Sequence, residues 1–201
     1  MTFWDFCAPF YDFAERRNAI AYNAMIKTVR DAIPASASVL EVAAGTGSIS
    51  LGIADKVKNV LCTDMSLKML AVARKKARKH DVKNIDFSNA NIFSINKPDG
   101  AFDVVIAGQV LHLIDEPEKA AAELRRVASS MVIMPISFTK GLKGRAKLML
   151  SIFRLFGFAP KRELALSEYA SFLCGIGFEN CEVIPLEGTI PMAVGVWRKK
   201  R

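Results

Sequence analysis

The chain has 201 residues, of which 51% are hydrophobic and 24% are charged, and its formal net charge is +8 at pH 7. This length fits one compact domain, and the hydrophobic content excludes a disordered chain. Most of the positive excess lies in residues 138–201, so the basic character belongs to the C-terminal third.

Three other classes of protein are disfavoured. Residues 1–13 are aromatic and carry Asp5 and Asp12 where a secretory signal needs basic residues and then a plain apolar run. No apolar stretch reaches the roughly 18 to 20 residues that a membrane span requires. The four cysteines have no paired spacing and no histidines nearby, which argues against a disulfide framework and against a bound metal. We therefore expect a soluble, cytoplasmic protein.

Helical and strand patterns alternate along the first two thirds of the chain. The first element is a helix predicted over residues 16–33, which ends before Pro34. Short apolar runs predict strands over 38–42, 57–63, 85–88, 102–107 and 131–136. Further helices are predicted over 48–54, 66–79 and 116–128. Strands separated by helices need crossover connections, so they should form a largely parallel sheet with helices on both faces.

The C-terminal part departs from this alternation. A helix is predicted over 167–174, and two strands over 181–185 and 192–197 are joined by a short turn. Two strands with no helix between them pair antiparallel. The predicted fold is therefore α/β, a Rossmann-like, seven-stranded, mostly parallel sheet with an antiparallel C-terminal hairpin and helices on both faces.

The most informative segment runs from Val39 to Ser48 and reads Val-Leu-Glu-Val-Ala-Ala-Gly-Thr-Gly-Ser. A buried strand that enters a glycine turn and then a helix lets the backbone approach a ligand closely, because glycine has no Cβ. Asp64 follows at the end of the second predicted strand, where a carboxylate can accept both hydroxyls of a ribose. A ligand that contains a nucleoside is therefore expected at this edge of the sheet.

Two details distinguish among nucleosides. A dinucleotide site requires Gly-x-Gly-x-x-Gly, but the residues from position 45 are Gly-Thr-Gly-Ser-Ile-Ser and lack the third glycine. Glu41, at the head of the turn, would repel a phosphate and favour a cation. S-adenosylmethionine carries a sulfonium and an amino group and no phosphate, so the charge balance favours it. A nucleotide-dependent oxidoreductase is the less favoured alternative.

Several motifs together carry a resemblance to a known family. The first is the turn Glu41-x-Ala43-x-Gly45-x-Gly47, in which Ala43 replaces the usual glycine. The second is Asp64-Met65-Ser66, and the third is Ala90-Asn91-Ile92, where the family has Gly-Asp-Ala. The segments 102–105 and 109–113 complete the set. On these motifs, residues 38–128 resemble the core of the class I S-adenosylmethionine-dependent methyltransferases. The branch they resemble acts on small molecules and lipids and includes ubiquinone, menaquinone and phospholipid methyltransferases.

The resemblance implies a role for each matching residue. Gly45 and Gly47 would give backbone room for the methionine part, and Glu41 would orient its ammonium group. Asp64 would hold the ribose, and Met65 would lie against the adenine ring. Asn91 and Ile92 would contact the edge of the adenine ring. The main chain of residues 107–109, with Gln109, would face the amino acid end. The implied cofactor is S-adenosylmethionine, with S-adenosylhomocysteine as its product and no metal.

We expect one methyltransferase domain over residues 1–201. Its parts would be an N-terminal helical cap (1–33), the cofactor-binding core (38–137), a lid-like insertion (138–165) and a C-terminal helix with the hairpin (166–201). Methyl transfer from a sulfonium is an in-line displacement of an activated donor, so the protein must mainly position the acceptor in a dry pocket.

Two side chains are candidates for a catalytic role. His112 can accept a proton near the methyl group, or it can be a packing residue in a Leu-His-Leu run. Tyr11 resembles a tyrosine that closes over the cofactor in this family, or it can pack with its aromatic neighbours on the sheet. A methyltransferase-like domain that binds without catalysis is a further alternative.

The expected acceptor is a small molecule or a lipid. Residues 107–110 are Ala-Gly-Gln-Val and lack the Asn-Pro-Pro-aromatic motif typical of enzymes that methylate base nitrogens or glutamine amides, so nucleic acid is disfavoured. In the insertion, one helical face would carry Leu148, Ile152, Leu155 and Phe156, and another Lys147, Ser151 and Arg154. Five basic residues flank this helix: Lys140, Lys143, Arg145, Lys161 and Arg162. We hypothesise that the helix closes the acceptor pocket and contacts an acidic membrane surface; the alternative is a surface helix packed on the sheet.

Overall fold

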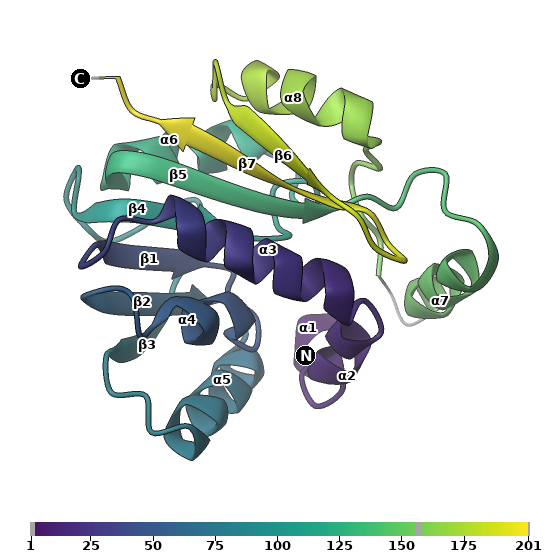
Figure 1. The fold of residues 1–201 in the computed structure, drawn as a ribbon, viewed down its shortest axis with the longest axis horizontal. Helices are drawn as coiled ribbons and strands as arrows, with labels where there is room; N and C mark the ends of the chain where they lie inside the picture. Colours follow the sequence, from purple (N-terminus) through teal and green to yellow (C-terminus); the bar gives the residue numbers. More distant parts are fainter. Residues whose placement is uncertain (1–2, 156–157, 201) are drawn as a thin grey trace.

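The computed structural model describes residues 3–155 and 158–200. Its centre is a seven-stranded sheet in the order β3-β2-β1-β4-β5-β7-β6 (Figure 1). The parallel strands are β1 (Ser38–Val42), β2 (Asn59–Asp64), β3 (Ile85–Asn89), β4 (Phe102–Ala107) and β5 (Ala128–Ser137). The strands β6 (Glu182–Leu186) and β7 (Met192–Arg198) pair antiparallel, and β7 also pairs antiparallel with β5. The predicted sheet with its antiparallel hairpin is confirmed.

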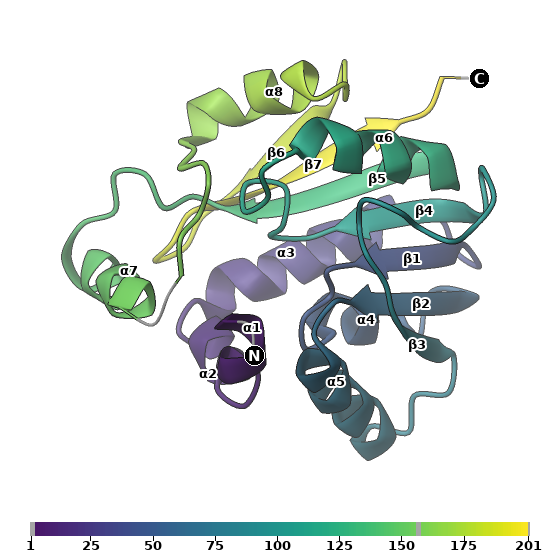
Figure 2. The same cartoon turned by 180° about the vertical axis from the view of Figure 1, so that it is seen from behind.

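Helices cover both faces of the sheet. On one face lie α3 (Ala19–Ala32), α4 (Ser48–Ile53) and α5 (Leu67–Lys79), and on the other lie α6 (Pro117–Val127) and α8 (Leu166–Gly175). Figure 1 shows α3 crossing in front of the sheet, and Figure 2 shows α6 in front when the molecule is turned. The helices α1 (Phe3–Cys7), α2 (Tyr11–Arg16) and α7 (Gly144–Leu155) lie beyond the carboxyl ends of the parallel strands.

The central strands are apolar at nearly every position because both of their faces are buried. In β1, Val39 belongs to the hydrophobic cluster on one face of the sheet, and Leu40 belongs to the cluster on the other. Val104 and Val105 of β4 alternate in the same way. Successive side chains of a strand point to opposite faces, which explains the continuous apolar runs. Glu41 is the buried exception.

The helix predicted over 16–33 begins later than expected, at Ala19. Asn18 is buried, and its Nδ2 donates to the carbonyl oxygen of Ile190 at 2.9 Å while its Oδ1 accepts from the Ile190 amide at 3.2 Å. This double hydrogen bond fastens the chain to the loop before β7 and turns it away from the axis of α3. Residues 3–16 instead form α1 and α2, which we call the aromatic cap.

The insertion contains the predicted helix, α7. Leu148 is 64% exposed, whereas Leu150 is buried. Phe156 lies outside the described residues, as do the side chains of Arg145, Ile152 and Leu155. Figure 1 shows α7 standing away from the sheet, so its outer apolar residues have no sheet surface to cover. Within the described part of the chain, no helix is both long and apolar enough to cross a membrane.

The helices α3 and α4 approach closely at Gly52, where a Cβ would lie 2.4 Å from Cγ2 of Ile26. Gly52→Ala should lower the free energy of unfolding by about 1 to 3 kcal/mol, because the branched Ile26 has little rotamer freedom with which to move aside. Urea denaturation followed by circular dichroism measures this loss. Gly175→Ala is the matched control, since a Cβ there meets no atom within 4 Å. Equal losses in the two variants would contradict the packing argument.

Candidate functional site

The turn after β1 bends through three residues in the left-handed region. The φ angles of Ala43, Gly45 and Gly47 are 50°, 55° and 74°. A Cβ at Gly47 would lie 3.0 Å from the Cβ of Ala73 on α5, so the close approach of this helix and the positive φ both favour glycine here. Ala43 carries a Cβ in a conformation that costs an L-residue roughly 1 to 2 kcal/mol. The turn is therefore held in place by its surroundings rather than by local preference.

Asp64 ends β2 and accepts hydrogen bonds from two backbone amides. Its Oδ2 accepts from the Gly45 amide at 2.8 Å, and its Oδ1 accepts from the Ser66 amide at 2.7 Å. Burial raises the pKa of Asp64, and the two amides partly counteract this effect. Asp64 thus ties the glycine turn of β1 to the end of β2, and its carboxylate keeps lone pairs for a ligand.

Glu41 on β1 is a buried carboxyl group, only 2% exposed. Its Oε2 accepts from the Ser50 amide at 2.9 Å and also from the Ser50 hydroxyl. Burial is the main cause that raises the pKa of Glu41 to about 7; the hydrogen bonds from Ser50 oppose the rise, and the negative charges of Glu15 and Asp64 contribute to it. A positive charge bound beside Glu41 would shift the pKa in the opposite direction.

These residues line a cavity of about 210 Å³ at the carboxyl ends of the parallel strands, which we call the acidic cavity. Three carboxyl groups line it: Glu15, Glu41 and Asp64. Among the described residues, no lysine, arginine or histidine does so. A cavity with acidic walls and no cation attracts a positively charged ligand and repels phosphate.

One wall of the acidic cavity is apolar. Met65, which is 67% exposed, lies there with Ile92 and Phe93 from the loop after β3, and these three side chains suit a flat ring. Asn91 is exposed and does not line the cavity, because its Oδ1 accepts from the Phe93 amide at 3.0 Å and shapes the turn behind the wall. The structure thus brings Ala43, Gly45, Met65 and Ile92 to the cavity but not Asn91 or Gly47.

Gln109 carries a buried donor that has no partner. Its backbone adopts a φ of 57°, and its Oε1 accepts from the Ser137 amide at 2.8 Å. The other end of the amide, Nε2, is buried and makes no hydrogen bond to any residue that the structure describes. A donor left in this state costs about 1 to 3 kcal/mol. Gln109 therefore marks a position where an oxygen atom of a ligand can bind.

A second cavity of about 400 Å³ adjoins the first, and we call it the apolar cavity because aromatic and aliphatic side chains form most of its wall. The aromatic cap, the loop after β4 and the insertion all contribute, with Leu150 and Phe158 coming from the insertion. Six residues line both cavities: Trp4, Tyr11, Glu15, Tyr22, Gln109 and Leu113. We call these six residues the boundary.

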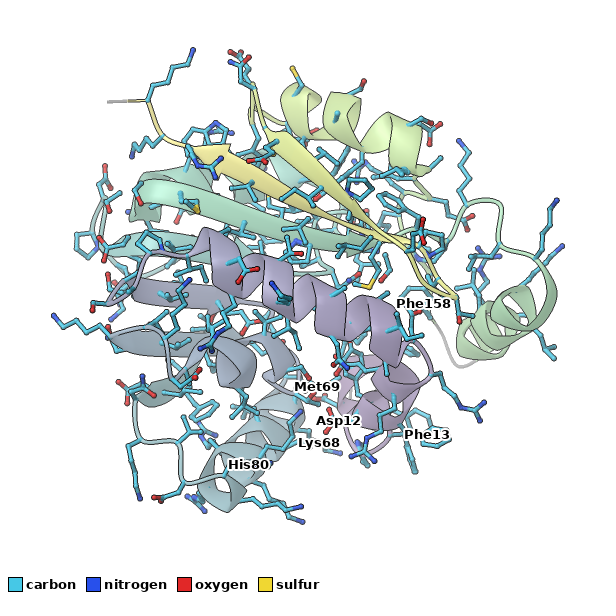
Figure 3. All side chains as sticks on the ribbon, in the orientation of Figure 1. Asp12, Phe13, Lys68, Met69, His80 and Phe158 are labelled. Carbon is cyan, nitrogen blue, oxygen red and sulfur yellow. The ribbon has the colours of Figure 1, made fainter. Side chains whose placement is uncertain are left out.

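The aromatic cap is fastened over the acidic cavity by hydrogen bonds from hydroxyl groups to carboxylates. Three such bonds, each 2.6 Å long, join Ser66 to Asp5, Thr46 to Asp12 and Ser48 to Glu15. Lys76 of α5 also donates to Asp12, at 2.9 Å. Figure 3 shows Asp12 where α2 faces α5. The cap is thus bound to the glycine turn and to the loop after β2.

The two candidate catalytic side chains lie on different walls. His112 is buried and lines only the apolar cavity, and burial lowers the pKa of His112 to about 4, so it is neutral at pH 7. Tyr11 lines both cavities, and its Cε1 atom is 3.8 Å from a Cβ built at Gly45. Burial raises the pKa of Tyr11, which keeps the phenol protonated. Tyr11 therefore lies over the glycine turn.

Sequence reasoning gave no role to Trp4, Glu15, Tyr22 or Phe93. Tyr11 and Glu15 are four residues apart in α2 and so lie on one face of the helix, a spacing that could have drawn attention to Glu15. No local signal distinguishes Tyr22 or Phe93, because their place at the cavities depends on how distant segments pack.

Comparisons with known proteins find methyltransferases among those similar to this chain. A family model for a methyltransferase domain matches residues 40–132. Over 154 residues the chain is 29% identical to demethylmenaquinone methyltransferase of Thermus thermophilus, which covers 73% of this chain and 69% of that protein. Over 89 residues it is 40% identical to demethylmenaquinone methyltransferase of Renibacterium salmoninarum, covering 44% of this chain and 35% of that protein. A SAM-dependent methyltransferase of Thermotoga maritima, a possible histamine N-methyltransferase, shares the fold with a TM-score of 0.72 and 19% identity, covering 98% of this chain and all of that one.

Residues 40–132 match a methyltransferase domain, and this match together with the relatives supports a class I S-adenosylmethionine-dependent methyltransferase. S-adenosylmethionine fits the acidic cavity of this methyltransferase, because the carboxylates match its positive charges and Gln109 offers an unpartnered donor. The phosphates of a dinucleotide would meet three carboxylates and no cation there, which disfavours the oxidoreductase alternative. The predicted family and cofactor are confirmed.

Glu41→Gln should change how the stability of the ligand-free methyltransferase depends on pH. The pKa of Glu41 is raised to about 7 in the folded state, so the stability that the neutral carboxyl supplies is present near pH 4 and is lost as the pH rises through 7. Between pH 5.5 and pH 8.0 the wild type should lose up to about 2 kcal/mol more than the variant in urea denaturation. Asp86→Asn, on an exposed position of β3, is the control and should follow the wild type. If the stability of Glu41→Gln depends on pH in the same way as that of the wild type, ionisation of the buried Glu41 does not cause the loss of stability.

Proposed function

We propose that this methyltransferase transfers the methyl group of S-adenosylmethionine to an apolar small molecule held in the apolar cavity. The observation that carries the proposal is the boundary, where a cavity suited to a cation meets a cavity suited to an apolar ligand. In-line displacement needs the acceptor atom about 3 Å from the methyl carbon and collinear with sulfur. Among the described residues, the boundary is where a ligand in the apolar cavity can approach the methyl group of a ligand in the acidic cavity.

The residues of the acidic cavity divide the donor among them. When bound, S-adenosylmethionine supplies an electrophilic methyl group on a positively charged sulfur. We assign Glu41 to its ammonium group and Asp64 to the ribose hydroxyls, for which the carboxylate keeps free lone pairs. The amide Nε2 of Gln109 supplies a hydrogen bond to the carboxylate at the amino acid end. Met65, with Ile92 and Phe93 beside it, contacts the adenine ring.

The aromatic cap and the apolar cavity position the acceptor. Trp4 and Tyr11 belong to the boundary and come from the aromatic cap, and we assign them to keeping water away from the reacting groups. His112 is neutral and lines the acceptor side, so we assign it a hydrogen bond to the acceptor. Its lowered pKa makes it a weak base at pH 7, since a general base works best with a pKa near the working pH.

Asp64→Ala should weaken binding of S-adenosylmethionine at least tenfold, because it removes the acceptor of the ribose hydroxyls and the anchor of the Gly45 amide. Isothermal titration calorimetry measures the affinities for S-adenosylmethionine, S-adenosylhomocysteine and NAD. Asp86→Asn is again the control and should bind like the wild type.

Wild-type binding to NAD but not to S-adenosylmethionine would overturn the proposed function. Formation of S-adenosylhomocysteine with a panel of phenols, quinols, amines and lipids separates an enzyme from a domain that only binds.

The rim of the apolar cavity supports a lipid acceptor and contact with an acidic membrane. Phe6 and Phe10 line the cavity and are 50% and 66% exposed. Exposed Leu148 and the basic Lys143 and Lys147 lie in or beside α7. Exposed apolar side chains combined with basic ones are typical of surfaces that bind the interface of anionic membranes.

Lys143→Glu with Lys147→Glu should abolish most co-sedimentation with phosphatidylserine vesicles at low salt, because each lysine near an anionic surface contributes about 1 kcal/mol and each glutamate repels. Lys75→Glu with Lys79→Glu on α5 gives the same change in net charge away from the rim, and these positions are exposed. Equal binding by the two double variants would contradict docking through the rim.

We also infer a cytoplasmic location. Cys7, Cys62, Cys174 and Cys181 are all free thiols in the described structure. Free thiols at four separate positions are typical of a reducing compartment.

A further inference from the structure

Glu15 is the one carboxylate, among the described residues, that lines both cavities. The other boundary residues are uncharged at neutral pH: Trp4, Tyr11, Tyr22, Gln109 and Leu113. Under the proposed function the methyl group crosses this boundary, so Glu15 stands beside its path. Any proton that the acceptor loses is released next to this carboxylate.

Glu15 is held in position but not neutralised by a lysine. Ser48 Oγ donates to its Oε2 at 2.6 Å, whereas Lys76 donates to Asp12. The charged and titratable groups that face Glu15 come from four elements: Asp12 and Tyr11 from α2, Tyr22 from α3, Glu41 from β1 and Lys76 from α5. Burial raises the pKa of Glu15 to about 7, with Asp12 adding to this effect and Ser48 and Lys76 opposing it.

We propose that Glu15 loses a proton when the cationic donor binds and regains one from the acceptor when the methyl group has been transferred. The proposal rests on the proposed function, because it requires a positive charge in the acidic cavity. A cation there favours the ionised carboxyl group, and removal of that charge favours the protonated one. The charge on the bound nucleoside therefore sets the protonation state of Glu15.

The transfer step balances with Glu15 as the proton acceptor. A lone pair of the acceptor atom forms the bond to the methyl carbon, and the carbon–sulfur bond breaks with its electron pair going to sulfur. The proton of the acceptor passes to the Glu15 carboxylate, and the positive charge of the donor disappears in the same step. Glu15 thus becomes a stronger base as the reaction proceeds. The acceptor class this favours is an apolar molecule with an ionisable hydroxyl or amine at the reacting end.

His112 does not compete for this role. It lines the apolar cavity alone, and burial lowers the pKa of His112 to about 4. A group with that pKa holds a proton poorly at neutral pH, whereas a carboxyl group with a pKa near 7 can both accept and release one.

Calorimetry without any acceptor tests the proposal. Binding of S-adenosylmethionine at pH 7.0 is measured in two buffers with different ionisation enthalpies, and so is binding of the product S-adenosylhomocysteine, whose sulfur carries no charge. The wild type should release up to about half a proton more with S-adenosylmethionine than with the product, because a group at its pKa is half protonated. Between pH 6 and pH 8 the preference for S-adenosylmethionine over the product should rise up to about tenfold.

Glu15→Gln should abolish both the difference in proton release and the pH dependence of this preference. Asp86→Asn is the control, because Asp86 is exposed on β3 and lines neither cavity, and it should keep both. If Glu15→Gln binds both nucleosides with the proton release of the wild type, this inference is wrong and the proposed function stands. If the wild type does not bind S-adenosylmethionine, the proposed function is wrong and the inference falls with it.

Discussion

The methyltransferase depends on holding carboxyl groups in a buried site where no basic side chain of the described chain pairs with them. Glu41 and Glu15 have pKa values raised to about 7, and the pKa of Asp64 is raised as well, in each case chiefly by burial. Carboxylates without a cation are costly in such surroundings. A positively charged nucleoside removes that cost, so the stability of the site and its choice of ligand have one physical origin.

The fold maintains this arrangement by bonding each carboxyl group to a donor from another segment of the chain. Asp64 of β2 accepts from the glycine turn of β1, Glu41 of β1 accepts from Ser50 of α4, and Glu15 of the aromatic cap accepts from Ser48. These bonds link two strands, one helix and the cap across the carboxyl edge of the sheet. The donors are amides and hydroxyls, which orient a carboxylate without cancelling its charge. The site is thereby organised for a cation before one binds.

Methyl transfer requires the donor in the acidic cavity and the acceptor in the apolar cavity to meet, and the two cavities adjoin at the boundary. The acidic cavity is built from the ends of parallel strands, whereas the apolar cavity is closed by the aromatic cap and the insertion. The acidic cavity therefore lies where open α/β sheets generally bind ligands, outside the carboxyl ends of the strands. The apolar cavity depends on segments outside the alternating core, which suits a part of the protein that selects the acceptor.

The sequence by itself determined the sheet, the glycine turn and the place of Asp64, because apolar runs, helix periodicity and left-handed glycines are local properties. It also indicated a cationic nucleoside, since Glu41 and the missing third glycine are visible in one short segment. The tertiary structure alone decided that Asn91 turns away from the cavity, that Gly47 approaches Ala73 closely, and that Glu15 lies at the boundary. Those outcomes depend on contacts between residues far apart in the chain, and no local pattern encodes such contacts.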